Sequence, residues 1–267
     1  MGLQGKTIGQ YQLIELIHQG QNTIYKGFQP SMKRQVAVKT FSPSLAKAKV
    51  FTQQFGWEME LIVELEHAHI LPVYDYGQVD DLLYIVTPYV ESGTLQDRLP
   101  PGLSPQATQA MIDPISAALD YAHTWGVVHG NLKPSNVLFD SEGQPLLADI
   151  GTFHNAGFAA RNNAYVSPEQ EAQDAAVDGR TDVYALGVLL YEMLIGEPPS
   201  VGADSSLRLM RPDLPVGIET VIRQAMAPYP EDRFPWAGDL NDALARVLTS
   251  RAEPRATSAF VRGMVTW

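Results

Sequence analysis

The chain has 267 residues, of which 45% are apolar, so it is long enough to bury the core of one large domain or of two lobes. It contains no cysteine, which excludes disulfides and cysteine-rich metal sites, and we expect a reducing, cytoplasmic compartment. The formal net charge of -11 would repel nucleic acid and anionic membrane surfaces, so neither is an expected partner.

No stretch of the sequence predicts a membrane-spanning helix. The longest apolar run, residues 184–196, contains Glu192 and is shorter than the about 20 residues that a span requires. The first residues include Lys6 and lack a long apolar core, so we also expect no signal peptide. Residues 249–267 are rich in Arg, Ala and Ser and are predicted to be a tail or linker.

The first part of the chain alternates short apolar runs with turn residues. Between residues 11 and 41 these runs are rich in Ile, Val and Tyr and are separated by turn signals such as Gly20, which predicts an antiparallel meander. Residues 82–90 continue it. One helix is predicted between these strands, over residues 45–66, because its apolar residues recur at helical spacing.

Glu58 lies on the apolar stripe of that predicted helix, with Phe51, Phe55 and Ile62. A carboxylate on a buried face is costly unless a cation pairs with it, so Glu58 requires a basic partner. Glu60 points to another side of the helix and is expected in solvent.

From Ser104 onward the pattern changes to helices. Ser104 followed by Pro105 is a helix start signal, a strongly apolar helix is predicted over residues 182–194, and amphipathic segments follow up to Leu248. The sequence therefore predicts an α+β fold, in which a cleft separates a small antiparallel sheet with one helix from a larger, mainly helical part. The predicted segments are an N-terminal extension (1–10), a strand-rich lobe (11–91), a helical lobe (92–248) and the tail (249–267).

Three motifs occur in an order that resembles a known family. Residues 36–39 read Val-Ala-Val-Lys on a predicted strand, residues 129–136 follow a predicted helix, and residues 149–151 read Asp-Ile-Gly. In this order they resemble the bacterial Hanks-type serine/threonine protein kinases, over residues 11–248. The resemblance implies the two-lobed protein kinase fold, with ATP and Mg²⁺ as cofactors and a protein as substrate or partner.

The resemblance also implies roles for matching residues. Lys39 would hold the α- and β-phosphates and be held by Glu58, which is the glutamate that the buried stripe selects independently. Asp149 and Asn136 match the two metal-holding positions, whose hard oxygens suit Mg²⁺. Lys133, in the catalytic loop, resembles the serine/threonine rather than the tyrosine kinases.

The adenine site is likewise implied by resemblance. Adenine would lie between Ile24 and Ala37 on one side and Leu138 on the other, with the backbone N–H of Val90 as a donor from the linker. Pro88 in the same linker has no N–H, but the family uses only the carbonyl at that position. The alternative for the apolar residues is ordinary core packing.

Two parts of the pattern depart from the family. Ile17, Gln19 and Asn22 replace the three glycines that let a loop approach the phosphates, so we expect weakened phosphate binding. Asn131 stands at the catalytic-base position, and its uncharged amide cannot accept the substrate's proton. Gly130 replaces an arginine that in many relatives receives an activation-loop phosphate, and the loop from Thr152 to Val166 is short, with Thr152 and Tyr165 as its only hydroxyl residues. Control by loop phosphorylation is therefore not expected.

The leading hypothesis is a pseudokinase that retains some binding of ATP and Mg²⁺, transfers phosphoryl groups weakly or not at all, and acts as a signalling scaffold or allosteric partner. The alternative is a weakly active ATP-dependent serine/threonine kinase, because a positioned base contributes about 10² to 10⁴ in rate while this chemistry depends mainly on positioning. A different transferase reaction on the same fold has no support in the sequence. His67 and His69 are interpreted as structural residues rather than a metal pair.

Overall fold

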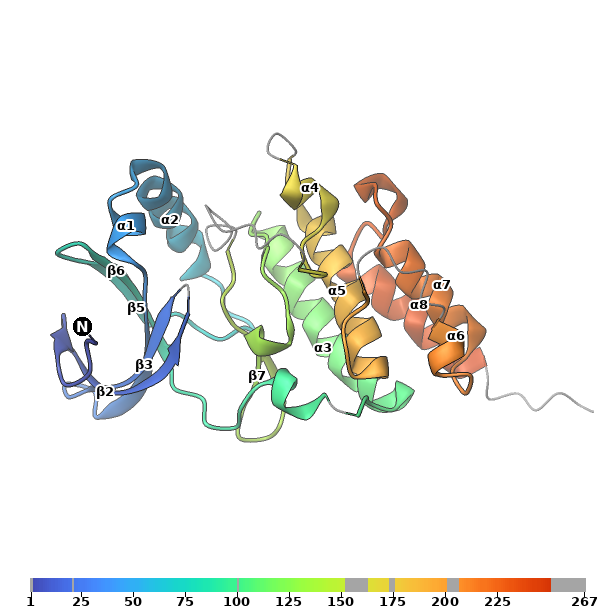
Figure 1. Ribbon diagram of the computed structural model, residues 1–267, viewed down its shortest axis with the longest axis horizontal. Helices are drawn as coiled ribbons and strands as arrows, with labels where there is room; N and C mark the ends of the chain where they lie inside the picture. Colours follow the sequence, from blue (N-terminus) through green and yellow to red (C-terminus); the bar gives the residue numbers. More distant parts are fainter. Residues whose placement is uncertain are drawn as a thin grey trace, which may run out of the picture.

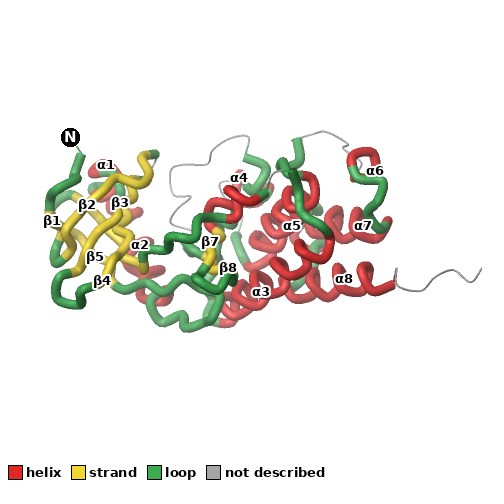
Figure 2. The backbone as a smooth tube through the Cα atoms, turned by 90° about the horizontal axis from the view of Figure 1, so that it is seen from below, coloured by secondary structure: helices red, strands yellow, loops and turns green. Residues whose placement is uncertain are grey.

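The computed structural model describes residues 2–20, 22–99, 101–151, 163–172, 176–200 and 207–250. A strand-rich lobe lies at one end of the molecule and a helical lobe at the other (Figure 1). Figure 2 shows the same division from a second side, with most strands gathered near the N-terminus. This is the α+β, two-lobed arrangement that the sequence predicted.

Within the described residues, the strand-rich lobe is built on a six-stranded antiparallel sheet with the order β1-β2-β3-β4-β6-β5. The strands are β1 (Thr7–Ile8), β2 (Tyr11–Gln19), β3 (Thr23–Gln29), β4 (Arg34–Thr40), β5 (Asp75–Val79) and β6 (Leu82–Pro88). Because β1 pairs with β2, the sheet already begins within residues 1–10, ahead of the predicted lobe boundary.

The alternation of side chains along β4 decides which of its residues face the cleft. Val36 and Val38 are fully buried in a small apolar cluster on one side of the sheet. Ala37 and Lys39 alternate with them and line the cleft on the other side. Ala37 and Lys39 therefore lie on the same face of β4, the face that lines the cleft.

Two helices follow β4, namely α1 (Pro43–Ala46) and α2 (Lys49–Ile62). They replace the single helix predicted over residues 45–66, because Ala48 has an extended backbone (φ -78°, ψ 104°) that separates them. Phe51 and Phe55 of α2 pack against Phe41, with ring centroids 5.9 and 5.6 Å from its ring.

The register of α2 is the one that the apolar stripe predicted. Glu58 is buried, with 9% of its surface exposed, and Glu60 is exposed. Trp57, one residue before Glu58, lies on the solvent side and is 64% exposed. The buried carboxylate is therefore turned toward the interior of the lobe.

The helical lobe has short strands and turns on the side nearer the six-stranded sheet and longer helices beyond them (Figure 1). In chain order its elements are η1 (Leu95–Arg98), α3 (Pro105–Thr124), η2 (Pro134–Asn136), β7 (Val137–Phe139), β8 (Pro145–Leu147), α4 (Pro168–Glu171), α5 (Gly179–Ile195), α6 (Leu207–Met210), α7 (Val216–Ala225), η4 (Pro230–Asp232) and α8 (Ala237–Ser250). In the part of the chain that is described, no helix is both long and apolar enough to cross a membrane.

The long helices pack around α5. Helix α3 packs against α5 and α8, and α5 also packs against α7. Ser104 caps α3 as predicted, since its side chain accepts a hydrogen bond from the N–H of Ala107 at 3.1 Å. Helix α5 is buried on nearly all sides, so its two buried carboxylates, Asp182 and Glu192, need partners inside the protein.

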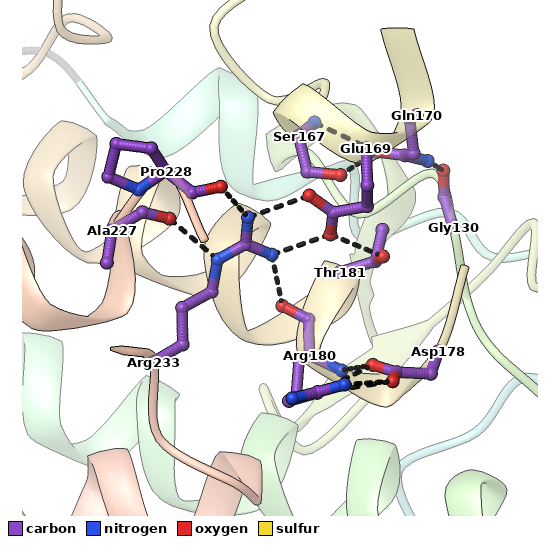
Figure 3. A network of polar contacts seen from close by, with 10 residues as sticks. All are labelled: Gly130, Ser167, Glu169, Gln170, Asp178, Arg180, Thr181, Ala227, Pro228 and Arg233. Atoms are coloured by element: carbon purple, nitrogen blue, oxygen red, sulfur yellow. Dashed lines mark hydrogen bonds and ion pairs between the residues drawn. The ribbon is translucent and has the colours of Figure 1, made fainter. Parts of the chain in front are cut away.

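A buried ion pair between Glu169 and Arg233 fixes the short helix α4 (Figure 3). Arg233 Nη1 and Nη2 lie 2.6 and 2.7 Å from the two oxygens of Glu169, and none of the arginine side chain is exposed. Burial raises the pKa of Glu169, but hydrogen bonds from Arg233 and Thr181 outweigh it and hold the pKa below its ordinary value. The guanidinium also donates to the carbonyl oxygens of Arg180, Ala227 and Pro228.

Substituting the buried arginine tests this anchor. Arg233→Met leaves the Glu169 carboxylate buried without its cation, so we expect the free energy of unfolding to fall by about 3–5 kcal/mol. The matched control Arg223→Met removes an arginine that is 74% exposed and pairs with Glu219 on the same helix, and should cost about 0.5 kcal/mol or less. Urea unfolding followed by circular dichroism measures both, and equal losses would contradict the role of the buried pair.

Candidate functional site

A cleft of about 890 Å³ lies between the sheet and the helical lobe, within the size range of small-molecule sites. Its walls include every predicted site residue except Glu58, namely Ile24, Ala37, Lys39, Val90, Asn131, Lys133, Asn136, Leu138 and Asp149. Residues that are far apart in the sequence and belong to different elements are thus brought to one cavity.

The apolar part of the cleft is formed by both lobes. Ile24 on β3 and Ala37 on β4 belong to the sheet, and Leu138 on β7 belongs to the helical lobe. The linker after β6 forms one edge of the cleft. Lys26 on β3 contacts this linker, because its Nζ lies 3.5 Å from Glu91 Oε1 and 4.3 Å from the centre of the Tyr89 ring. This geometry suits a flat apolar ring whose edge reaches the linker backbone.

The polar part of the cleft contains an ion pair that crosses between the lobes. Lys39 Nζ on β4 lies 2.7 Å from Asp149 Oδ2. Asp149 has a left-handed backbone with φ 61°, which is uncommon outside glycine and aims its side chain at the cleft. Glu58 accepts a hydrogen bond from Gln54 Nε2 at 2.8 Å, and its pairing with Lys39 stays a prediction.

Asn136 and Asp149 provide the oxygen atoms that would hold a divalent cation. The Nδ2 of Asn136 donates to the carbonyl of Asn131 at 2.8 Å, so its amide oxygen is the atom suited to a metal. Among the described residues, no group of three or more His, Cys, Asp or Glu could hold a metal ion. Mg²⁺ fits this donor set because it is commonly bound by one or two protein oxygens together with substrate phosphates.

Lys133 adds a second cation to the same region. Burial lowers the pKa of its ammonium, Asp149 opposes this shift, and Lys39 adds to it. An anion near Lys133 would favour the charged amine again, so the cleft is electrostatically suited to a phosphate.

The end of β2 and the turn that leads into β3 line the cleft with side chains rather than bare backbone. Ile17, His18 and Asn22 are part of the cavity wall and Gln19 is not, although the three β2 residues, Ile17, His18 and Gln19, are all exposed. A Cβ atom at Gly20 would lie only 2.8 Å from His18 Nε2, so this glycine makes room for the histidine ring. Of the three residues at the family's glycine positions, Ile17 and Asn22 therefore line the cavity and Gln19 does not, and His18 is a lining residue that the sequence had not singled out.

Asp182 on α5 binds the backbone of the catalytic loop, residues 129–136. The carboxylate accepts hydrogen bonds from the backbone N–H groups of His129 and Gly130, both at 2.8 Å, and lies 2.7 Å from His123 Nε2. Burial lowers the pKa of the His129 ring, with smaller opposing effects from Asp182 and Asp149. The central helix therefore fixes the backbone immediately before Asn131.

These features match a known family. A sequence profile of the family described as "Protein kinase domain" matches residues 11–260. The chain belongs to the protein kinase family. The chain is 30% identical to serine/threonine-protein kinase PknE of Mycobacterium tuberculosis, over 98% of this chain and 50% of PknE. It is 32% identical to PknD of the same species, over 97% of this chain and 43% of PknD. The chain thus spans about half the length, or less, of these curated relatives.

Solved structures confirm the predicted two-lobed kinase fold. The kinase domain of M. tuberculosis PknI has a TM-score of 0.79 and 32% sequence identity, covering 91% of this chain and 98% of that one. A double mutant of the same PknI domain has a TM-score of 0.82 at 31% identity, covering 92% of this chain and 99% of that one.

The cleft also contains a residue of the activation segment, the stretch that runs from Asp149 into α4, that the prediction from sequence had missed. Tyr165 lines the cavity and its hydroxyl donates a short hydrogen bond to Glu192 of α5. Burial raises the pKa of Glu192, which the bond from Tyr165 partly opposes. The signal was available, since Glu192 is the charge that interrupts the longest apolar run. Two regions lie outside the described residues: residues 152–162 and most of the predicted tail, 251–267. The expected absence of loop phosphorylation depends on the first of them and stays a prediction.

Asp182→Asn tests how firmly α5 holds the catalytic loop of this kinase. The substitution turns one acceptor oxygen into a donor that faces another donor, so we expect a loss of about 2–4 kcal/mol in the free energy of unfolding. Amide hydrogen exchange at His129 and Gly130 should accelerate. The control Asp81→Asn affects an ion pair in which both side chains are more than half exposed, and should change neither quantity measurably.

Proposed function

We propose that this protein kinase domain is a pseudokinase that binds a magnesium complex of ATP weakly and acts through protein partners. The observation that carries the proposal is Asn131, an uncharged amide lining the cleft at the position of the family's catalytic base. Lys39, Asn136 and Asp149, which would hold the nucleotide and its metal, line the same cleft as Asn131.

Individual residues supply separate parts of the binding site. Ile24, Ala37 and Leu138 would contact the adenine, and Val90 would donate its backbone N–H to the ring edge. Lys39 and Lys133 would contact the phosphates, while the oxygens of Asn136 and Asp149 would hold Mg²⁺. When bound, the nucleotide supplies a transferable phosphoryl group.

Two features support weak rather than tight binding. The 2.7 Å ion pair between Lys39 and Asp149 would have to break when MgATP binds, because the ammonium would contact a phosphate and the carboxylate would hold the metal. In addition, Ile17 and Asn22 line the cavity at positions where the family pattern has glycine, so this part of the chain would not approach the phosphates as closely as a glycine backbone would. Both effects reduce the net free energy that is gained when the nucleotide binds.

A pseudokinase with this geometry would use nucleotide as a structural ligand. Lys39 belongs to the strand-rich lobe and Asn136 to the helical lobe, so a ligand that contacts both favours one relative placement of the lobes. A protein that recognises this placement would respond to nucleotide without any phosphoryl transfer. A cytoplasmic signalling partner is the proposed target, consistent with the family and with the acidic, cysteine-free composition.

A weakly active serine/threonine kinase is the second candidate. It is favoured by Lys133, which is retained in the catalytic loop and lines the cleft beside Asn131. Loss of a general base costs about 10² to 10⁴ in rate, which leaves room for slow transfer if the phosphates are well positioned.

Thermal unfolding with nucleotide tests the binding part of the proposal. At ligand concentrations several times a millimolar Kd, MgATP should stabilise the fold by about 1 kcal/mol and raise the Tm by about 2–4 °C. Asp149→Ala should abolish the dependence on Mg²⁺, while the control Asp81→Ala should keep it because this residue lies in an exposed ion pair. No shift and no heat of binding at millimolar MgATP would leave a scaffold without nucleotide.

Restoring the missing groups tests the catalytic part. Asn131→Asp supplies a base but leaves the side chains of Ile17 and Asn22 in the cavity wall, and Ile17→Gly with Asn22→Gly removes these side chains but supplies no base. We expect the triple variant to transfer radiolabelled phosphate to a generic protein substrate well above the sum of the two partial repairs, because groups acting together in catalysis are not additive. Adding Asp149→Ala to it should remove the activity. Robust, Asp149-dependent transfer by the unmodified protein would instead establish the active kinase.

A further inference from the structure

Gly130, next to Asn131, is held at both of its backbone polar groups. Its N–H donates to Asp182 Oδ1 at 2.8 Å, and its carbonyl accepts a hydrogen bond from Gln170 Nε2 at 2.8 Å. Its φ of 67° is a left-handed conformation that glycine adopts without strain, but glycine also loses more conformational freedom on folding than any other residue. External contacts are therefore what keep this point of the catalytic loop in one conformation.

The orientation of the Gln170 amide is fixed by both of its neighbours. Its Oε1 accepts from the backbone N–H of Ser167 at 3.0 Å and from the Ser167 hydroxyl at 3.1 Å. A backbone N–H can only donate and the Gly130 carbonyl can only accept, so the nitrogen of the amide must face Gly130. The Ser167 contacts form a capping box at the start of α4.

Gln170 extends from a rigid support. Glu169, the preceding residue of α4, is held by the buried ion pair with Arg233. Figure 3 shows Glu169 and Gln170 directed to opposite sides, one toward Arg233 and the other toward Gly130. The end of the activation segment is thus connected to the helical core on one side and to the catalytic loop on the other.

The contact at Gly130 continues into the cleft. Asn131 follows directly, and its carbonyl accepts the hydrogen bond from Asn136 Nδ2 that orients the amide oxygen suited to Mg²⁺. Gln170 itself is not among the residues that line the cavity. Any influence on a ligand must therefore pass through the loop.

We propose that Gln170 is a positioning residue: its side-chain amide fixes the catalytic loop at Gly130, and thereby Asn131 and Asn136, without a phosphate or a charge. Both partners of the bond are neutral, so this connection between activation segment and catalytic loop is permanent rather than switched. Its effect on a ligand rests on the proposed binding of MgATP, whereas its effect on the loop does not.

Gln170→Glu separates the two functions of the side chain. Glutamate keeps the acceptor for Ser167, so the capping box of α4 is preserved. When ionised it has no proton for the Gly130 carbonyl and repels that oxygen, but when protonated it can donate again. Partial burial and the nearby carbonyl should raise the pKa of this introduced carboxyl above its ordinary value of about 4.3, against the hydrogen bonds from Ser167, which lower it.

The first readout is the affinity for MgATP by calorimetry, expressed relative to wild type at each pH. At pH 8 we expect Gln170→Glu to bind about three- to tenfold more weakly, the range expected for loss of one hydrogen bond, and at pH 5.5 to recover toward wild type. Gln170→Ala loses both contacts and should be weakened equally at both pH values. Gln224→Glu, which adds the same charge at an exposed position of α7, should match wild type throughout.

The second readout needs no nucleotide. In ¹⁵N-labelled protein, the amide resonances of Gly130 and Asn131 should show a titration in Gln170→Glu that is absent from wild type and from Gln224→Glu. Asp182 and His129 lie beside these amides, and Asp149 and Lys133 lie in the cleft, but these ionisable groups are common to all the variants. Subtracting the wild-type curve therefore isolates the introduced group.

The outcomes separate the two proposals. If wild type shows no binding of MgATP but the added titration is present, the proposed nucleotide binding fails while Gln170 is still a positioning residue for the loop. If Gln170→Glu shows no added titration, or if its affinity equals wild type at pH 8, the positioning role is wrong. Recovery of Gln170→Ala at pH 5.5 would likewise contradict it, because alanine has no group to protonate.

Discussion

The arrangement of the site depends on one buried carboxylate, that of Asp182 on α5. It has no exposed surface, accepts hydrogen bonds from the backbone of His129 and Gly130, and contacts the ring of His123. A buried charge is stable only when its oxygens are used in this way, so the central helix and the catalytic loop must be formed together. The backbone that carries Asn131 is thereby positioned by the core of the helical lobe.

The two lobes contribute differently to the cleft that rests on this support. The helical side is fixed by buried polar contacts, including the pair of Glu169 with Arg233, and carries the potential metal-binding oxygens. The strand-rich side contributes Lys39, which already pairs with Asp149, and the side chains of Ile17 and Asn22 at positions where the family pattern has glycine. The cleft therefore contains Lys39, Asn136 and Asp149, while Asn131 presents an uncharged amide at the position that resembles the family's catalytic base.

Much of this could be predicted from local patterns. The period-two alternation of β4 places Lys39 on the cleft side, and the apolar stripe of α2 places Glu58 inside the lobe and Glu60 outside. The kinase fold followed from three motifs in fixed order, because each needs a particular neighbouring element. Helix boundaries were predicted less well, since the extended backbone at Ala48 that divides α1 from α2 has no strong local signal.

The sequence by itself determined which residue types face the interior and which chemical groups are present or missing, as with Asn131 in place of a carboxylate. Only the tertiary structure decided the partners: Asp149 for Lys39, Tyr165 for Glu192, and Gly130 for Gln170, a contact between residues 40 positions apart. The physical reason is that periodicity specifies the direction of a side chain relative to its own helix or strand, whereas a partner depends on how separate elements pack together.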